Sequence, residues 1–166
     1  MDRQQIGLKL ALDQLGLPAR LSSFDDRLVL QKGVYLAQAA GVDLGYFFHW
    51  YLRGPYSPSL TRDAFAMVND IKGGLDGSEG WQFDETSVQR LANLKPLIRE
   101  AQPPQLAARL ELLASVLFLL LNKRCHPDDN AGLREVLLRY GKQFTQEEID
   151  DAVGKLRQYG LVADQK

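Results

Sequence analysis

The spacing of apolar positions predicts helices along most of this chain. Leucines recur three and four residues apart over residues 3–16, and Gly16 ends that pattern. A second helix is predicted over residues 25–40, and Gly41 ends it. Its candidate N-caps are Ser22, Ser23 and Asp25. Its apolar positions leave a mostly polar second face that carries Arg27, Gln31, Lys32 and Gln38.

Five further helices are predicted by the same reasoning. Their spans are residues 58–71, 86–101, 105–121, 130–140 and the stretch between Thr145 and Gly160. Pro96 is expected to kink or split the helix that contains it. Thr145 and Glu148 form a capping-box pattern that marks the start of the last helix. The glycine-rich segment 73–80 is predicted to be a loop rather than a boundary between domains.

One segment has no helical period. Residues 46–52 are rich in aromatic side chains, which favours a short strand or extended segment. Gly54-Pro55 predicts a turn, and Ser57 is a candidate N-cap for the helix that follows. The sequence therefore predicts a mainly α fold, a single domain over residues 1–166 with about seven helices and a short strand or hairpin near 46–56.

Composition narrows the class of protein. The chain has 166 residues, 45% hydrophobic and 25% charged, with a formal net charge of −1, as expected for an ordinary soluble domain. That balance removes the simplest argument for nucleic-acid binding, although a local basic strip such as Lys123-Arg124 stays open. The longest apolar run, residues 114–121, is too short for a bilayer, which needs about 20 residues. With one cysteine and no signal-peptide pattern, the expected location is cytoplasmic, away from membranes.

The segment Cys125-His126-Pro-Asp128-Asp129 is the main candidate for metal binding or catalysis. It lacks the paired Cys or His spacing of zinc sites, so no metal and no cofactor are predicted. Adjacent side chains on a turn usually diverge, so Cys125 and His126 are a poor nucleophile and base pair. The chain has neither a Gly-x-Ser-x-Gly elbow nor a phosphate-binding glycine loop. We therefore predict that the protein is not an enzyme; a small enzyme using Cys125 and His126 is the minor alternative.

The last two helices suggest a second alternative, a nucleic-acid-binding regulator. A helix, a turn and a capped helix resemble a helix-turn-helix fragment, whose second helix reads the major groove. Here that helix opens with acidic residues, which repel phosphate: Glu147, Glu148, Asp150 and Asp151. Packing within the domain is the favoured interpretation of this pair, and nucleic-acid binding is possible but not favoured.

The segment His49 to Leu60, HWYLRGPYSPSL, is the strongest candidate for a binding site. The ring-bearing side chains of residues 47–51 fall on both faces of an extended segment, and one face is expected to stay accessible. Arg53 stands at the turn, where its planar guanidinium suits a carboxylate, a phosphate or backbone carbonyls. Aromatic residues and Arg are enriched at interface hot spots. Alternatively, Phe47, Trp50 and Tyr56 fill the core, and the corner is only framework.

The helix and the corner together resemble a known family. Residues 27–38, RLVLQKGVYLAQ, precede residues 51–60, YLRGPYSPSL. This pairing of Gln-Lys-x-x-Tyr with Gly-Pro-Tyr-Ser is similar to the Panacea (SocA-like) domain and the related YwgA-type proteins of bacteria and phages. The resemblance covers residues 24–65, about a quarter of the chain. Gly33 and Arg53 depart from the family pattern, in which a bulky residue and an aromatic residue are usual.

The resemblance implies a role without catalysis. Panacea-type domains neutralise toxins in toxin–antitoxin pairs, and related proteins occur among phage-defence genes. It therefore implies an accessory or antitoxin-like protein that binds a partner protein, with Lys32 and Tyr35 bracing the turn. The motif positions carried over are Gln31, Lys32, Tyr35, Tyr51, Gly54, Pro55, Tyr56 and Ser57. His49, Trp50 and Arg53, which belong to the same corner, complete the predicted partner-binding set.

Overall fold

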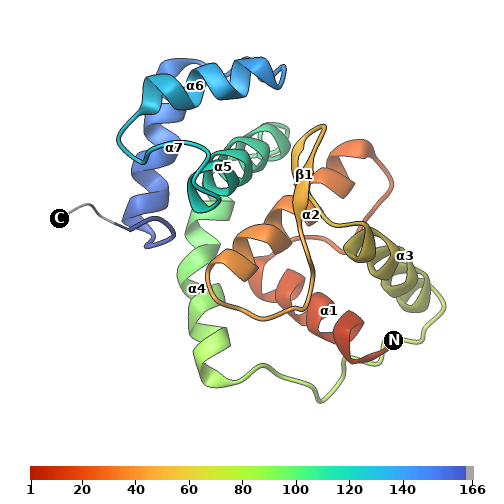
Figure 1. The fold of residues 1–166 in the computed structure, drawn as a ribbon. Helices are drawn as coiled ribbons and strands as arrows, with labels where there is room; N and C mark the ends of the chain where they lie inside the picture. The colour runs from red at the N-terminus through yellow and green to blue at the C-terminus, as the bar shows by residue number, and fades with distance from the viewer. Residues whose placement is uncertain (164–166) are drawn as a thin grey trace.

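A computed structural model describes residues 1–163 and shows a mainly helical fold (Figure 1). The described residues form seven helices and one two-stranded antiparallel hairpin, which confirms the predicted fold class. The elements are α1 (Arg3–Leu15), α2 (Phe24–Ala39), β1 (His49–Tyr51), β2 (Gly54–Tyr56), α3 (Pro58–Lys72), α4 (Glu85–Arg99), α5 (Leu106–Leu121), α6 (Asn130–Arg139) and α7 (Gln146–Gln158). None of these helices is long and apolar enough to cross a membrane.

Side-chain caps set several helix starts. Ser23 accepts a hydrogen bond from the Asp26 N–H at 3.0 Å, so it is the N-cap of α2 among the three candidates. The predicted capping box of α7 is present, since Thr145 and Glu148 each accept a hydrogen bond from the other's backbone N–H. Pro96 does not split α4, which runs on to Arg99. The buried leucines around Pro96 hold the helix together by packing, and a proline removes only one backbone hydrogen bond.

Helix α5 forms the centre of the hydrophobic core. Every residue from Leu110 to Leu120 is buried. One side of α5 packs against α2 and β2, another packs against α7, and α1 lies between α3 and α4 (Figure 1). The hairpin therefore rests directly on the most buried helix of the protein.

The aromatic segment before the hairpin is extended, but only His49–Tyr51 pairs as a strand. Gln38 fixes the approach to it, donating to the Tyr46 carbonyl at 2.8 Å and accepting from the Tyr46 N–H at 2.9 Å. From residue 47 to 51 the side chains alternate between exposed and half-buried, as on a strand with one covered face. Phe47 is 79% exposed, so the interpretation that it fills the core is wrong.

Candidate functional site

The hairpin turn lies in close contact with α5. Tyr51 pairs with Gly54, which has a left-handed φ of +91° that favours glycine. A Cβ atom at Gly54 would collide with the Oγ of Ser115 on α5. This position therefore demands glycine both for its backbone angle and for the approach of the hairpin to the helix.

Gln31 on α2 clamps the residue that starts α3. Its amide donates to the Ser57 carbonyl at 2.8 Å and accepts from the Ser57 N–H at 3.0 Å. The same amide nitrogen donates to the Thr61 hydroxyl at 2.8 Å, and that hydroxyl donates to the Tyr56 hydroxyl at 3.0 Å. Gln31 is only 4% exposed, so this polar residue of α2 lies inside the fold. The amide is buried because it satisfies backbone groups that have no strand or helix partner.

Lys32 also points inward and contacts strand β2. Its ammonium donates to the Pro55 carbonyl at 2.6 Å, and the residue is 2% exposed. Tyr35, one helical turn along, packs its ring against Phe48 at 5.2 Å and Phe118 at 6.1 Å between centroids. Lys32 therefore contacts β2, whereas Tyr35 packs against Phe48, the residue just before β1.

A buried group of charges lies beneath the turn. The Glu111 carboxylate accepts from the Lys142 ammonium at 2.6 Å, and the Arg53 guanidinium lies 3.6 Å from its other oxygen. Burial lowers the pKa of Lys32 to about 7. The negative charge of Glu111 acts to raise that pKa, and the positive charges of Lys142 and Arg53 act to lower it. Lys142 and Arg53 thus share the Glu111 carboxylate, and the charge on Lys32 is influenced by all three groups.

The aromatic residues of the corner divide into an inner and an outer group. Trp50 faces inward, with its ring 5.6 Å from that of Phe118 and 4.7 Å from that of Tyr140. His49 and Tyr51 face outward and flank Tyr56, at centroid distances of 6.3 Å and 5.5 Å. Only the outer group is placed to meet another molecule.

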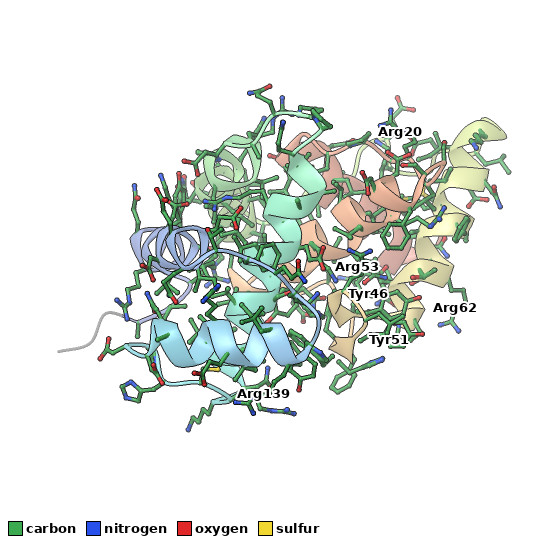
Figure 2. All side chains as sticks on the ribbon, turned by 90° about the horizontal axis from the view of Figure 1, so that it is seen from above. Arg20, Tyr46, Tyr51, Arg53, Arg62 and Arg139 are labelled. Carbon is green, nitrogen blue, oxygen red and sulfur yellow. The ribbon has the colours of Figure 1, made fainter. Side chains whose placement is uncertain are left out.

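A groove of about 630 Å³ lies beside the outer face, between α2, the hairpin and α3. Its lining residues are Phe24, Arg27, Leu28, Gln31, Lys32, Tyr51, Leu52, Arg53, Tyr56, Thr61 and Phe65. Figure 2 labels Tyr51 and Arg53 at the hairpin and Arg62 on α3. Four of the apolar lining side chains are 45–74% exposed, namely Phe24, Tyr51, Leu52 and Phe65. Five of the predicted site residues line this groove, namely Gln31, Lys32, Tyr51, Arg53 and Tyr56, and we call it the corner groove.

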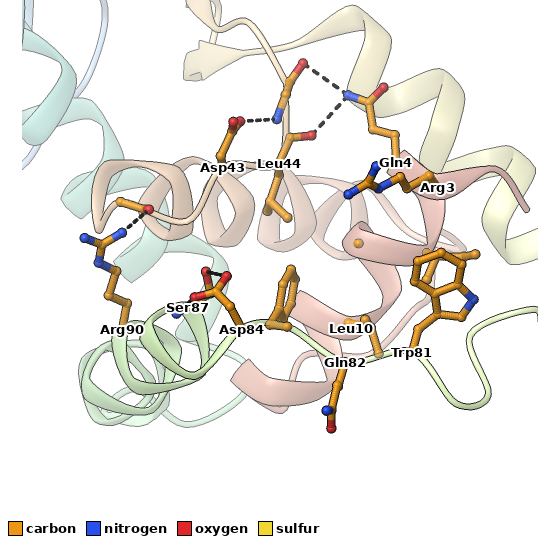
Figure 3. Close-up of a pocket in the computed structure, with 15 residues that line it drawn as sticks. Arg3, Gln4, Leu10, Asp43, Leu44, Trp81, Gln82, Asp84, Ser87 and Arg90 are labelled. Atoms are coloured by element: carbon orange, nitrogen blue, oxygen red, sulfur yellow. Dashed lines mark hydrogen bonds between the residues drawn. The ribbon is translucent and has the colours of Figure 1, made fainter.

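A second hollow, of about 890 Å³, lies between α1, the loop after α2 and the start of α4 (Figure 3). Its polar side chains mainly hold loops in place. The Gln4 amide donates to the carbonyls of Leu44 and Gly45 at 3.1 Å, and Arg90 donates to the Gly41 carbonyl at 2.6 Å. Because these groups serve the loop, the larger hollow is the weaker candidate for a binding site.

The structure offers little support for chemistry at Cys125 and His126. Burial raises the pKa of the Cys125 thiol, and the neighbouring charge of Asp129 adds to the effect, so the thiolate is disfavoured. The His126 Nδ1 accepts from the Asp128 N–H at 3.3 Å in its own turn. Among residues 1–163, no three His, Cys, Asp or Glu side chains gather as potential metal ligands.

The cations of α7 are engaged within the protein. Lys155 pairs with Glu100 at 2.9 Å, and Arg157 pairs with Asp128 at 2.9 Å. The first turn of α7 carries Glu147 and Glu148. Both are exposed, so α7 presents an acidic first turn to solvent, which disfavours contact with phosphate groups.

Several residues of the corner groove and of the charged group beneath the hairpin had not been identified from the sequence. Phe24 and Phe65 line the groove and are exposed, and neither belongs to the predicted partner-binding set. Lys142 belongs to a short connection before α7, and nothing nearby in sequence signals its burial. Glu111 could have been recognised from the sequence, because it is the single charged side chain in the apolar run 110–121. A lone carboxylate in such a helix indicates a buried ion pair.

Comparisons with protein-family models, with curated proteins and with solved structures returned no match for this chain. The resemblance to the Panacea and YwgA-type proteins therefore stays a prediction from residues 24–65.

Proposed function

We propose that this chain is a non-enzymatic accessory or antitoxin-like protein of a bacterial or phage toxin–antitoxin or defence system, and that it acts by binding a partner protein. The proposal rests on the family resemblance of residues 24–65 together with the geometry of the corner groove. The alternative, a nucleic-acid-binding regulator, finds less support because α7 presents its acidic turn outward.

One observation carries the proposal: large apolar side chains are exposed around a turn that is held rigidly from beneath. Leu52 is 74% exposed, Tyr51 54% and Phe24 52%. Exposed apolar clusters of this kind mark interaction sites in soluble proteins. The buried hydrogen bonds of Gln31 and Lys32 fix the backbone at Ser57 and Pro55, so little conformational freedom is lost on binding.

The test is affinity capture of the tagged chain from its host, followed by reconstitution with the purified partner. The variant Tyr51→Ser/Leu52→Ser removes apolar surface from the groove. Phe47→Ser is the matched control, because Phe47 is a more exposed aromatic residue of the same segment that does not line the groove. The expected result is a defined complex with the wild type and with Phe47→Ser, and its loss with the double variant.

An antitoxin-like role predicts more than binding. Expression of the captured partner alone should arrest growth, and co-expression of the wild-type chain should restore it, whereas the double variant should not. Capture of nucleic acid without protein, with binding that weakens steeply as salt increases, would favour the regulator instead.

A further inference from the structure

We infer that the corner groove recognises a short segment of the partner protein in which a carboxylate stands next to an aromatic or aliphatic side chain. This inference deepens the proposed function and rests on it. It names the chemistry of the contact, which the resemblance to the Panacea family does not supply.

The charge of the groove selects an anion. Arg27 and Arg53 line it, Lys32 is engaged with the Pro55 carbonyl, and among the described residues that line the groove none is acidic. Arg53 is 60% exposed and lies 3.6 Å from Glu111, which is longer than a direct hydrogen bond. The Arg53 guanidinium therefore has N–H donors left for a second carboxylate. Its planar geometry suits two parallel hydrogen bonds to such a group.

The walls of the groove select an apolar body. Phe24, Tyr51 and Phe65 expose ring surface on three sides, from α2, the hairpin and α3. The Arg53 guanidinium lies 5.4 Å from the centre of the Phe24 ring, so charge and ring surface adjoin. A volume of about 630 Å³ falls within the range of roughly 300–1,000 Å³ that is typical of ligand sites. A groove of this volume holds a few side chains of a partner rather than a whole domain.

The same surroundings disfavour an extended polyanion. Asp25 and Asp26 form the first turn of α2 beside Phe24, and Asp25 is exposed. A chain of phosphates that left the groove along α2 would meet these carboxylates. A peptide places its single carboxylate at the cations of the groove and continues out of the groove as uncharged backbone. The groove is thus matched to a peptide rather than to nucleic acid.

The experiment selects from random seven-residue peptides displayed on phage, using the folded, full-length chain as bait. Enriched peptides are expected to pair Asp or Glu with an adjacent aromatic or aliphatic residue. A fluorescein-labelled copy of the best peptide should then lose about tenfold or more in affinity when its acid becomes the amide, because a charge-assisted hydrogen bond is lost. Arg53→Gln and Phe65→Ser in the protein should cause comparable losses.

Arg62→Gln is the matched control, because Arg62 is an exposed arginine of α3 that does not line the groove. Circular dichroism confirms that each variant is folded. The inference is overturned if no peptide is enriched, if enriched peptides lack an acid, or if Arg53→Gln and Phe65→Ser bind as well as Arg62→Gln. Displacement of the peptide by a single-stranded oligonucleotide would also overturn it.

Capture of the native partner distinguishes a failure of this inference from a failure of the proposed function. If the partner is captured equally by the wild type and by Arg53→Gln, the groove is not the contact, and the proposed function stands without it. If the acidic peptide binds the groove but the host yields no protein partner, the groove chemistry stands and the proposed function fails.

Discussion

Replacement of Lys32 by Met is the sharpest test of the buried charge beneath the hairpin. The ammonium is 2% exposed, and its pKa falls from the ordinary lysine value of 10.5 to about 7. Because the folded pKa lies below the unfolded one, the unfolded chain binds more protons between these two values. The contribution of Lys32 to the free energy of unfolding therefore rises with pH across that window. It is lowest at and below about pH 7.

The size of the effect follows from the two pKa values. Between about pH 7 and about pH 9.5, the linkage relation gives Lys32 a gain of about 3 kcal/mol in the stability of the folded state. Lys32→Met has no proton to lose, so it should not show this gain. Met also leaves the Pro55 carbonyl without its donor, which costs about 1–3 kcal/mol at every pH.

Urea denaturation of both proteins at about pH 7 and about pH 9.5 measures the two effects. The stability of the wild type relative to Lys32→Met should increase by about 3 kcal/mol between the two conditions, since other titrating groups cancel in the difference. A difference that does not change with pH would refute the reasoning. It would mean that Glu111 holds the ammonium charged in spite of its burial. If Lys32→Met does not fold, the 13Cε shift of Lys32 in the wild type reports the same titration.

Three further substitutions test how the corner and the last helix are held. Gln31→Ala should lower the unfolding free energy by about 2–4 kcal/mol in urea, because the buried N–H and C=O of Ser57 lose their partners; a loss below about 1 kcal/mol would contradict the clamp. Gly54→Ala should cost about 2 kcal/mol or more, from its left-handed φ and its collision with Ser115, and Ser115→Gly should recover part of that loss in a double-mutant cycle. Thr145→Ala should cost about 1 kcal/mol by removing the cap of α7, with no effect on partner capture.

The helices and their ends were predictable because their signals are local. All seven helices of the described residues begin and end within two residues of the predicted positions, and caps such as Ser23, Ser57 and Thr145 contribute to this agreement. The turn, by contrast, was misplaced: Gly54 and Pro55 belong to strand β2 and pair with Tyr51 and Trp50, and the turn itself is Leu52-Arg53. A structural feature that depends only on a residue and its next few neighbours in the chain can be predicted from one sequence.

The burial of Gln31 and Lys32 was not predictable from the helical pattern. Apolar periodicity assigns polar side chains to the solvent face, and their partners at Ser57 and Pro55 lie 26 and 23 residues away. Only the fold brings those backbone groups over α2, where a buried carbonyl needs a donor. The ion pair of Glu111 and Lys142 spans 31 residues and was missed for the same reason.

The predicted site therefore combines two groups of residues with different tasks, and stability separates them. Gln31, Lys32 and Ser57 are buried, so substituting them disturbs the corner itself and would weaken partner binding only together with folding. Tyr51 and Arg53 are more than half exposed, so substituting them removes contact surface while the fold persists. A variant that loses its partner at unchanged unfolding free energy identifies a contact residue. A variant that loses both identifies framework, and Gly54, Pro55 and Ser57 of the Gly-Pro-Tyr-Ser motif are buried as framework residues are.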